Sequence, residues 1–342
     1  MAQMIKVDSV SKYFDTVRAV DEVSFTVGTG QVVGLLGPNG AGKTTTMRLL
    51  TGYLAADDGT IDIDGHDPAT DPVAARSVMG YLPENNPLYE EMFVDEYLRF
   101  IGALRGIAGG ELSQAIDRAA REVGVTEVLA RPIGELSKGY RQRTGLAAAV
   151  LHEPKIVILD EPTEGLDPNQ RVDIRTLIRK IGKKRTVLVS THVLSEVQNT
   201  CDRVLVMAEG RLVADSPMAD LAKQAMGTRT FSVMAKGTGI QKALENLSGI
   251  ALVRRDPDEK RIQSYTVTAK GDVDLRPLVF KLAAQSGWEL FELHEEKATL
   301  EEVFRQLTSD YAADAEAHES EKRARGRKGG TTAGPTAEGE TD

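Results

Sequence analysis

The feature that most constrains this chain is a glycine-rich octapeptide that follows an apolar run. The octapeptide is Gly37-Pro38-Asn39-Gly40-Ala41-Gly42-Lys43-Thr44, which fits the pattern G-x-x-x-x-G-K-[ST]. The run before it, Gln31–Leu36, predicts a buried strand that ends in a turn. Glycines let a backbone wrap closely around phosphate oxygens, and N–H groups at a helix N-terminus supply positive potential. A chance match would lack this context, so the segment predicts a phosphate-binding loop between a strand and a helix.

The residues that end the loop have the chemistry that a nucleoside triphosphate needs. Lys43 is expected to reach the β- and γ-phosphates, and the Thr44 hydroxyl is expected to ligate Mg²⁺. The whole octapeptide, together with Thr45, is expected to contact ATP. ATP and Mg²⁺ are therefore the predicted ligands.

A second predicted strand carries two acids to the edge of the same sheet. Ile156–Leu159 is apolar and is followed by Asp160 and Glu161. Because α/β sheets bind ligands at the carboxyl ends of their strands, we expect Asp160 to hold Mg²⁺, through water. Glu161 is expected to orient or deprotonate the attacking water. Taken alone, the pattern is equally compatible with carboxylates in a surface salt bridge.

The wider pattern predicts an α/β domain with a mostly parallel sheet. Arg171–Ile181 has helical spacing and separates two apolar strands, Ile156–Leu159 and Val187–Val189. The apolar spacing is also helical from Phe93 to Gly145. Other strands are predicted at Ile5–Val7, Val23–Val27 and Thr60–Asp64, and a hairpin at Val204–Ala208 and Arg211–Ala214.

A second, smaller α+β unit is predicted at residues 225–310, after a first domain at residues 1–222. Its pattern reads βαββαβ, which indicates a ferredoxin-like layer of helices on one sheet. A last helix is expected at Leu300–Leu307. Residues 312–342 contain no Ile, Leu, Val, Met or aromatic residue, so we expect a disordered charged tail. The elements expected in the second unit are Thr230–Ala235, Ile240–Leu247, Ala251–Arg254, Ile262–Thr268, Leu275–Ala284 and Trp288–Leu293.

Composition excludes several functions. The 342 residues include 42 basic and 51 acidic side chains, a net charge of −9, so no nucleic-acid partner is expected. The single cysteine, Cys201, excludes a disulfide scaffold and is expected to be a small buried side chain. No apolar run reaches the roughly 18 residues of a membrane helix, and the N-terminus has no signal-peptide core. We therefore expect a cytoplasmic protein whose membrane role, if any, comes through a partner.

Further motifs follow in a fixed order over about residues 5–215. They are an aromatic segment, Lys12-Tyr13-Phe14; a loop before a helix, Leu136-Ser137-Lys138-Gly139-Tyr140; Gly165-Leu166-Asp167; and His192. Together with the phosphate loop, this set resembles the ATP-binding cassette (ABC) ATPases. Lys138 and Tyr140 depart from the family's Leu-Ser-Gly-Gly-Gln signature, and Glu164 stands where a small residue is usual.

The resemblance implies a P-loop NTPase with a RecA-like core, an antiparallel β-subdomain and a helical subdomain near residues 88–148. It also implies a head-to-tail dimer with a second ATPase subunit, either a second copy of this chain or a close relative. There, Ser137 and Gly139 close over the γ-phosphate bound by the other chain, as suits donors at a helix N-terminus. His192 would be the switch histidine and Asp167 the D-loop aspartate.

The aromatic segment resembles the one that stacks on adenine in this family. Its spacing to Ala19-Val20 favours Phe14 as the stacking ring. Tyr13 in that role, with Phe14 packed inward, is the alternative.

Two segments resemble the ATPases of ABC-2-type exporters. They are Ala298–Thr308 and Gly80–Tyr89, and the second also resembles gliding-motility-associated bacterial members. The resemblance implies ABC-2-type permease partners and a position on the inner face of the cell membrane. Glu84 stands where the family usually has glutamine, so it is expected to contact ATP and Mg²⁺ when the site closes. A solvent-exposed Glu84 is the alternative, and Asn85–Tyr89 is expected to line the docking groove.

Other classes of cassette ATPase fit less well. Those that act on ribosomes carry two cassettes in one chain, and this chain has one. Those of DNA repair insert a long coiled coil, for which residues 44–136 leave no room. A regulatory module that binds ATP without hydrolysing it would not need Glu161 and His192. A soluble ATPase acting on the ribosome remains the alternative function. Nothing in the sequence names a transported substrate.

Overall fold

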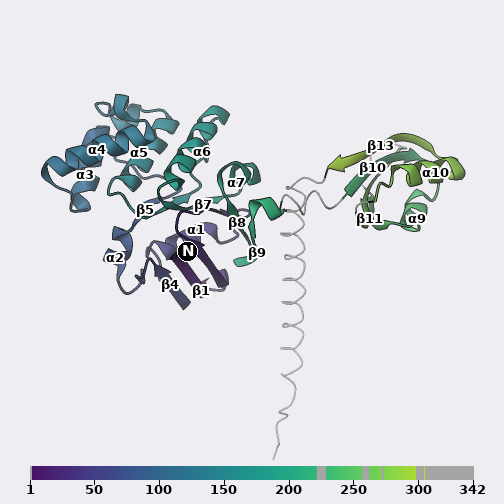
Figure 1. Cartoon of the computed structure of the whole chain (residues 1–342), viewed down its shortest axis with the longest axis horizontal. Helices are drawn as coiled ribbons and strands as arrows, with labels where there is room; N and C mark the ends of the chain where they lie inside the picture. The colour runs from purple at the N-terminus through teal and green to yellow at the C-terminus, as the bar shows by residue number, and fades with distance from the viewer. Residues whose placement is uncertain (1, 222–228, 256–261, 272, 298–303, 305–342) are drawn as a thin grey trace, which may run out of the picture.

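The computed structural model describes residues 2–221, 229–255, 262–271, 273–297 and 304 (Figure 1). Within them the strands form three sheets. The six-stranded sheet has the order β5-β6-β7-β3-β8-β9, parallel from β5 to β8, with β9 antiparallel to β8. The predicted mostly parallel sheet and the hairpin are thereby confirmed. Its strands are β3 (Val32–Leu36), β5 (Met79–Leu82), β6 (Ile156–Asp160), β7 (Thr186–Thr191), β8 (Arg203–Ala208) and β9 (Arg211–Pro217).

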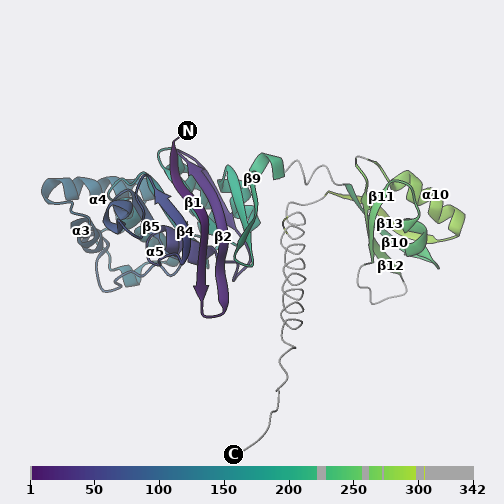
Figure 2. The ribbon, with the colours of Figure 1, turned by 90° about the horizontal axis from the view of Figure 1, so that it is seen from below.

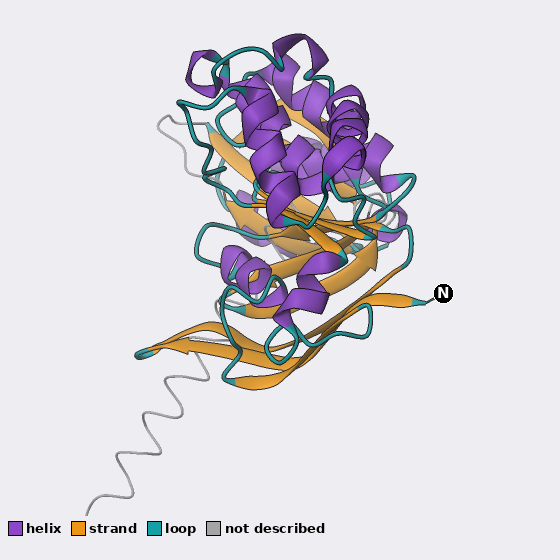
Figure 3. Ribbon diagram, turned by 90° about the vertical axis from the view of Figure 1, so that its left-hand side faces the viewer, coloured by secondary structure: helices purple, strands orange, loops and turns teal. Residues whose placement is uncertain are grey.

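The apolar run of β3 is buried on both faces of this sheet. Val33 and Leu35 join a core shared with helix α1 (Lys43–Leu50) and the three-stranded sheet. Val32 and Leu36 face the other way, into the core beneath the helices between residues 94 and 200. Successive side chains of a strand point to opposite faces, so a doubly covered strand must be apolar throughout. Figure 3 shows helices above this sheet and the three-stranded sheet below it.

The three-stranded antiparallel sheet has the order β2-β1-β4, with β1 (Gln3–Phe14), β2 (Val17–Gly28) and β4 (Asp58–Ile63) (Figure 2). Both β1 and β2 are much longer than predicted, at 12 residues each. Register shifts interrupt their alternation, and Ser9 and Glu22 take positive φ. These bulges hide the two-residue period on which the prediction depended. Phe14 is the last residue of β1.

Helices α3, α4 and α5 fill the range predicted for the helical subdomain. Helices α2 and α7 were not predicted, because each is too short to show a helical period in its apolar residues. One of them, α2, begins with Asp71 as its N-cap and Pro72 in its first turn. The helices beyond α1 are α2 (Pro72–Ser77), α3 (Val94–Leu104), α4 (Gly109–Val123), α5 (Lys138–Val150), α6 (Pro168–Gly182) and α7 (Leu194–Thr200), with single 3₁₀ turns at Thr126–Val128 and Ile133–Glu135.

The C-terminal part is a four-stranded antiparallel sheet of order β11-β12-β10-β13 with two helices. Phe231, Tyr265 and Val279 lie in a separate core. Of the predicted helix Leu300–Leu307 only Phe304 lies within the described residues; it packs against the core beneath α3–α7. The predicted tail lies outside them. The elements are β10 (Arg229–Lys236), α9 (Ile240–Glu245), β11 (Ile250–Arg255), β12 (Gln263–Ala269), α10 (Arg276–Ser286) and β13 (Glu289–Lys297).

Candidate functional site

The octapeptide joins β3 to α1, as predicted, and its backbone is packed so closely that glycine is required. Gly42 is the N-cap of α1 with φ 96°. A Cβ atom on Gly42 would lie 2.3 Å from the carbonyl oxygen of Ala19, and one on Gly37 would lie 2.4 Å from that of Met207. The loop can therefore curl without side chains between its backbone and a ligand.

The ammonium group of Lys43 is buried inside this loop. Its Nζ donates to the carbonyl oxygens of Gly37 at 2.9 Å and Pro38 at 3.2 Å. It also lies 3.4 Å from Oε1 of Glu161. A carboxylate from the end of β6 thus faces the lysine of the phosphate loop across the site.

The carboxylate of Glu161 lies between Lys43 and His192. Its Oε2 lies 3.1 Å from Nδ1 of His192. Its own backbone N–H donates to Oγ of Ser190 at 3.0 Å. Glu161 has a φ of 46°, a left-handed backbone conformation that is energetically unfavourable for any residue with a Cβ atom. The structure thus brings Lys43, at the start of α1, together with Glu161 and His192, which directly follow β6 and β7.

Asp160 is buried beside them. Its Oδ1 accepts a hydrogen bond from Ser190 Oγ at 2.5 Å and from Thr44 Oγ1 at 3.4 Å, whereas Oδ2 is buried with no partner. Burial raises the pKa of the Asp160 carboxyl, as do the charges of Glu84 and Glu161, while the hydrogen bonds from Ser190 and Thr44 oppose the shift. An orphaned carboxylate oxygen next to a hydroxyl suits a divalent cation.

No group of three or more His, Cys, Asp and Glu side chains in the described part of the chain could hold a metal by itself. A cation at Asp160 would therefore need further oxygen ligands from phosphates and water, which is the usual environment of Mg²⁺ at nucleotides. The residues present fit that cation.

Comparison with known proteins decides the family. Residues 20–164 match the family model described as ABC transporter. The chain is 38% identical to the uncharacterized ABC transporter ATP-binding protein YxlF of Bacillus subtilis, over 68% of this chain and 77% of that protein. It is 32% identical to the daunorubicin resistance ATP-binding protein DrrA3 of Streptomyces coeruleorubidus, over 90% of this chain and 96% of that protein. The chain belongs to the ABC transporter ATP-binding proteins.

A solved structure supports the same assignment. The ATP-binding subunit of an ABC transporter superposes with a TM-score of 0.58 at 31% identity, over 65% of this chain and 92% of that one. The fold is that of a P-loop NTPase cassette, as predicted. Homologous cassettes are ATPases coupled to transport, so the prediction that this chain is an ATPase is confirmed.

The predicted signature loop forms the N-terminus of α5. Ser137 is the N-cap, and its exposed side chain accepts a hydrogen bond from the backbone N–H of Tyr140 at 3.4 Å. Gly139 is buried against Gln170, where a Cβ atom would lie 2.9 Å from the amide carbon. Asp167 caps α6 by accepting from the backbone N–H of the same Gln170 at 2.9 Å. Through Gln170 of α6, the predicted signature loop and the predicted D-loop aspartate thus lie close together within one cassette.

The aromatic segment ends the β1–β2 hairpin. Phe14 is 45% exposed, and the Lys12 ammonium lies 5.8 Å from the centre of its ring. Tyr13 is half-buried, with the Arg18 guanidinium 5.7 Å from its ring centre. Phe14 is therefore not packed inward, and it is the more available of the two rings.

Glu84 lies exposed in the turn after β5, with a charge that acts on Asp160. Beyond it, the Asn86 side chain donates to the carbonyl oxygen of Arg141 in α5 at 2.9 Å. Of the segment expected to line a groove, Asn86 and Pro87 do line a cleft, whereas Leu88 packs against the core.

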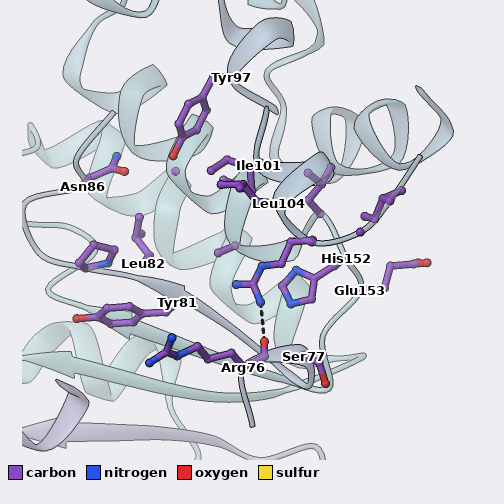
Figure 4. A pocket seen from close by; sticks show the side chains of 18 of the residues that line it. Arg76, Ser77, Tyr81, Leu82, Asn86, Tyr97, Ile101, Leu104, His152 and Glu153 are labelled. Atoms are coloured by element: carbon purple, nitrogen blue, oxygen red, sulfur yellow. Dashed lines mark hydrogen bonds between the residues drawn. The ribbon is translucent and has the colours of Figure 1, made fainter. Parts of the chain in front are cut away.

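The cleft has a volume of about 810 Å³. In Figure 4, Tyr97, Ile101 and Leu104 of α3 lie across it from Arg76 and Tyr81. Its other ionisable lining residues are Arg105, Glu111, Arg118, His152 and Glu153.

His152 is a half-buried residue that lines this cleft. Burial lowers its pKa to about 4, so the ring is neutral, and its Nε2 lies 3.0 Å from the carbonyl oxygen of Met79. Analysis of the sequence missed this cation-rich lining, because its members come from segments far apart in the chain. It also missed Ser190, which lies near the end of the predicted strand that precedes His192.

Proposed function

We propose that this chain is the ATP-hydrolysing subunit of an ABC-2-type exporter. The observation that carries the hydrolytic part is the contact of Glu161 with both Lys43 and His192. The exporter part is supported by the similarity to a daunorubicin resistance protein, which extends over 90% of this chain and so reaches beyond the cassette.

The residues of the site suit the chemistry of phosphoryl transfer to water. Lys43 would leave Glu161 for the β- and γ-phosphates, which offer it a stronger ionic partner. Glu161, thus released, would orient or deprotonate the attacking water. His192 would hold the carboxylate of Glu161 and contact the γ-phosphate side of the site.

Asp160 and the Thr44 hydroxyl would hold Mg²⁺, which when bound neutralises charge on the β- and γ-phosphates. The partnerless Oδ2 of Asp160 supports this assignment. Glu84 would approach the same cation only when the site closes, since it lies in an exposed turn.

Other ATP contacts would come from further residues of this chain and from a second subunit. The octapeptide and Thr45 would cradle the phosphates, and Phe14 would stack on adenine. Ser137 and Gly139 of a second subunit would complete the γ-phosphate site in a head-to-tail dimer, with Asp167 at the dimer face. The side chain of Ser137 lies exposed at the N-terminus of α5, where a second chain can reach it, and this supports the arrangement.

The cleft between α3 and β5 is our proposed docking site for the permease. Its lining is apolar at α3, and Pro83 and Asn86, on either side of Glu84 in the chain, also line it, so that a docked segment could sense the nucleotide. No helix among the described residues is long and apolar enough to cross a membrane. We propose that the chain attaches to the inner face of the membrane through this contact.

We propose that residues 225–310 form a ferredoxin-like domain after a cassette of residues 1–222. The strand order β11-β12-β10-β13 with two helices supports it. The resemblance to gliding-motility-associated ATPases stays a prediction.

The hydrolytic role is tested by Glu161→Gln. We expect the variant to bind ATP, to lose at least about 100-fold in turnover, since a positioned base typically contributes that much, and to accumulate an ATP-bound dimer. Glu209→Gln, on the exposed β8–β9 turn, is the control and should keep wild-type turnover. Turnover of Glu161→Gln near the wild-type rate would exclude the assigned role.

The transporter role is tested by co-purification. A polytopic membrane protein of the ABC-2 type, encoded nearby, should be retained by the tagged chain from detergent extracts. Co-sedimentation with ribosomes and no retention of that membrane protein would favour the alternative function.

A further inference from the structure

A buried carboxylate outside the ATP contacts links the two loops that carry the catalytic candidates. Glu196, in the first turn of α7, is only 8% exposed. Its Oε2 accepts a hydrogen bond from Thr163 Oγ1 at 2.6 Å and another from Thr191 Oγ1 at 2.9 Å. In the described part of the chain no Lys, Arg or His forms an ion pair with it. Two hydroxyl groups thus replace the cation that a buried carboxylate usually requires.

The two threonines belong to the two catalytic loops. Thr163 follows Glu161 in the loop after β6, and Thr191 immediately precedes His192 at the end of β7. Thr191 Oγ1 also accepts a hydrogen bond from the backbone N–H of Val193 at 3.1 Å, which fixes the turn around His192. One carboxylate oxygen, Oε2 of Glu196, therefore links the two loops.

The last two residues of β7, Ser190 and Thr191, point to opposite faces of the sheet and form different hydrogen bonds. Ser190 reaches Asp160 and the backbone of Glu161, and Thr191 points the other way, to Glu196. Glu161 itself is held at a positive φ, a conformation that persists only where its surroundings enforce it. Ser190 restrains the chain at Glu161, and the hydrogen bond of Thr163 to Glu196 restrains it just after.

We propose that Glu196 is a positioning residue for ATP hydrolysis, which holds Glu161 and His192 in contact through Thr163 and Thr191. The inference rests on the proposed function, because it assigns the reaction to the Glu161–His192 pair. It predicts an effect on kcat rather than on ATP affinity, since Glu196 touches neither the phosphate loop nor Phe14.

The test compares Glu196→Ala with Glu196→Gln in the full chain. Alanine removes the acceptor, so kcat should fall about tenfold or more while KM for ATP changes less than about twofold. The amide oxygen of glutamine can still accept both hydroxyl hydrogen bonds, so Glu196→Gln should stay within about threefold of the wild-type kcat. Glu122→Ala is the matched control: Glu122 is also largely buried and paired, with Arg185, but it lies in α4. It should leave kcat unchanged.

Two further measurements separate positioning from a loss of folding. Thr163→Val and Thr191→Val should each lower kcat and should add little in the Glu196→Ala background, as coupled residues do. In histidine-selective NMR spectra of the ATP-free protein, Glu196→Ala should move the resonance of His192 and leave those of His66 and His152 in place. If Glu196→Ala does not fold, the two threonine variants decide the question.

The outcomes distinguish the two proposals. A folded Glu196→Ala variant with wild-type kcat and an unmoved His192 resonance would overturn the positioning role, while the effect of Glu161→Gln would stand. Equal loss in Glu196→Gln and Glu196→Ala would also overturn it, because the acceptor would not be what matters. Full turnover by Glu161→Gln would instead remove the proposed function itself.

Discussion

At the scale of single residues, burial of the ionised Asp160 carboxylate lowers the free energy of unfolding, and a bound Mg²⁺ would offset that loss. The raised pKa of Asp160 means that the native state keeps this proton to a higher pH than the unfolded chain does. The free energy of unfolding should therefore fall as pH rises through that pKa. Without nucleotide and Mg²⁺, Asp160→Asn should raise Tm near pH 7 by a few degrees, as roughly 1 kcal/mol would in a unit of this size, and should abolish turnover. Thermal unfolding from about pH 4 to 8 checks this, and a lower Tm for the variant at every pH would contradict it.

At the scale of elements, the β1–β2 hairpin presents Phe14 as a flat exposed surface, with Tyr13 covered by Arg18. Phe14→Ala should weaken ATP binding by about 1–2 kcal/mol, the usual cost of one lost aromatic stack. GTP should compete with ATP, because stacking needs only a ring face. Calorimetric titration measures both. Tyr13→Ala is the control; a loss of affinity there, with none for Phe14→Ala, would exchange the two roles.

At the scale of the whole molecule, the cores are separate. Two cores draw their buried residues from Met4 to Leu221, and the third from Phe231 to Trp288. A chain truncated after Leu221 should bind ATP with a Kd within about threefold of the full chain, because the ligand contacts stay complete. It should also unfold at a lower temperature, since Phe304 no longer packs on the first of these cores. A folded truncated chain that binds no ATP would contradict this.

The sequence by itself determined the phosphate loop, the acids after β6 and the alternation of strands and helices. Each depends on residues that are neighbours in the chain, and a local pattern of glycines, apolar residues and charges specifies them. The burial of β3 on both faces follows from its uninterrupted apolar run in the same way. The full length of strands β1 and β2 was not predicted, because bulges interrupt the two-residue period that indicates a strand.

Only the tertiary structure decided which distant residues meet. The strand order β6-β7-β3 places Ser190 beside Asp160 and His192 beside Glu161, and it lets Glu196 join Thr163 to Thr191. The pairing of β5 with β6 also places the exposed Glu84 near Asp160, where its charge raises the pKa of that carboxyl. Chain order does not reveal which strands will be neighbours. Hydrogen bonds and burial act between atoms a few ångströms apart, however far apart their residues are in the sequence, so contacts between separate strands exist only once the sheet has formed.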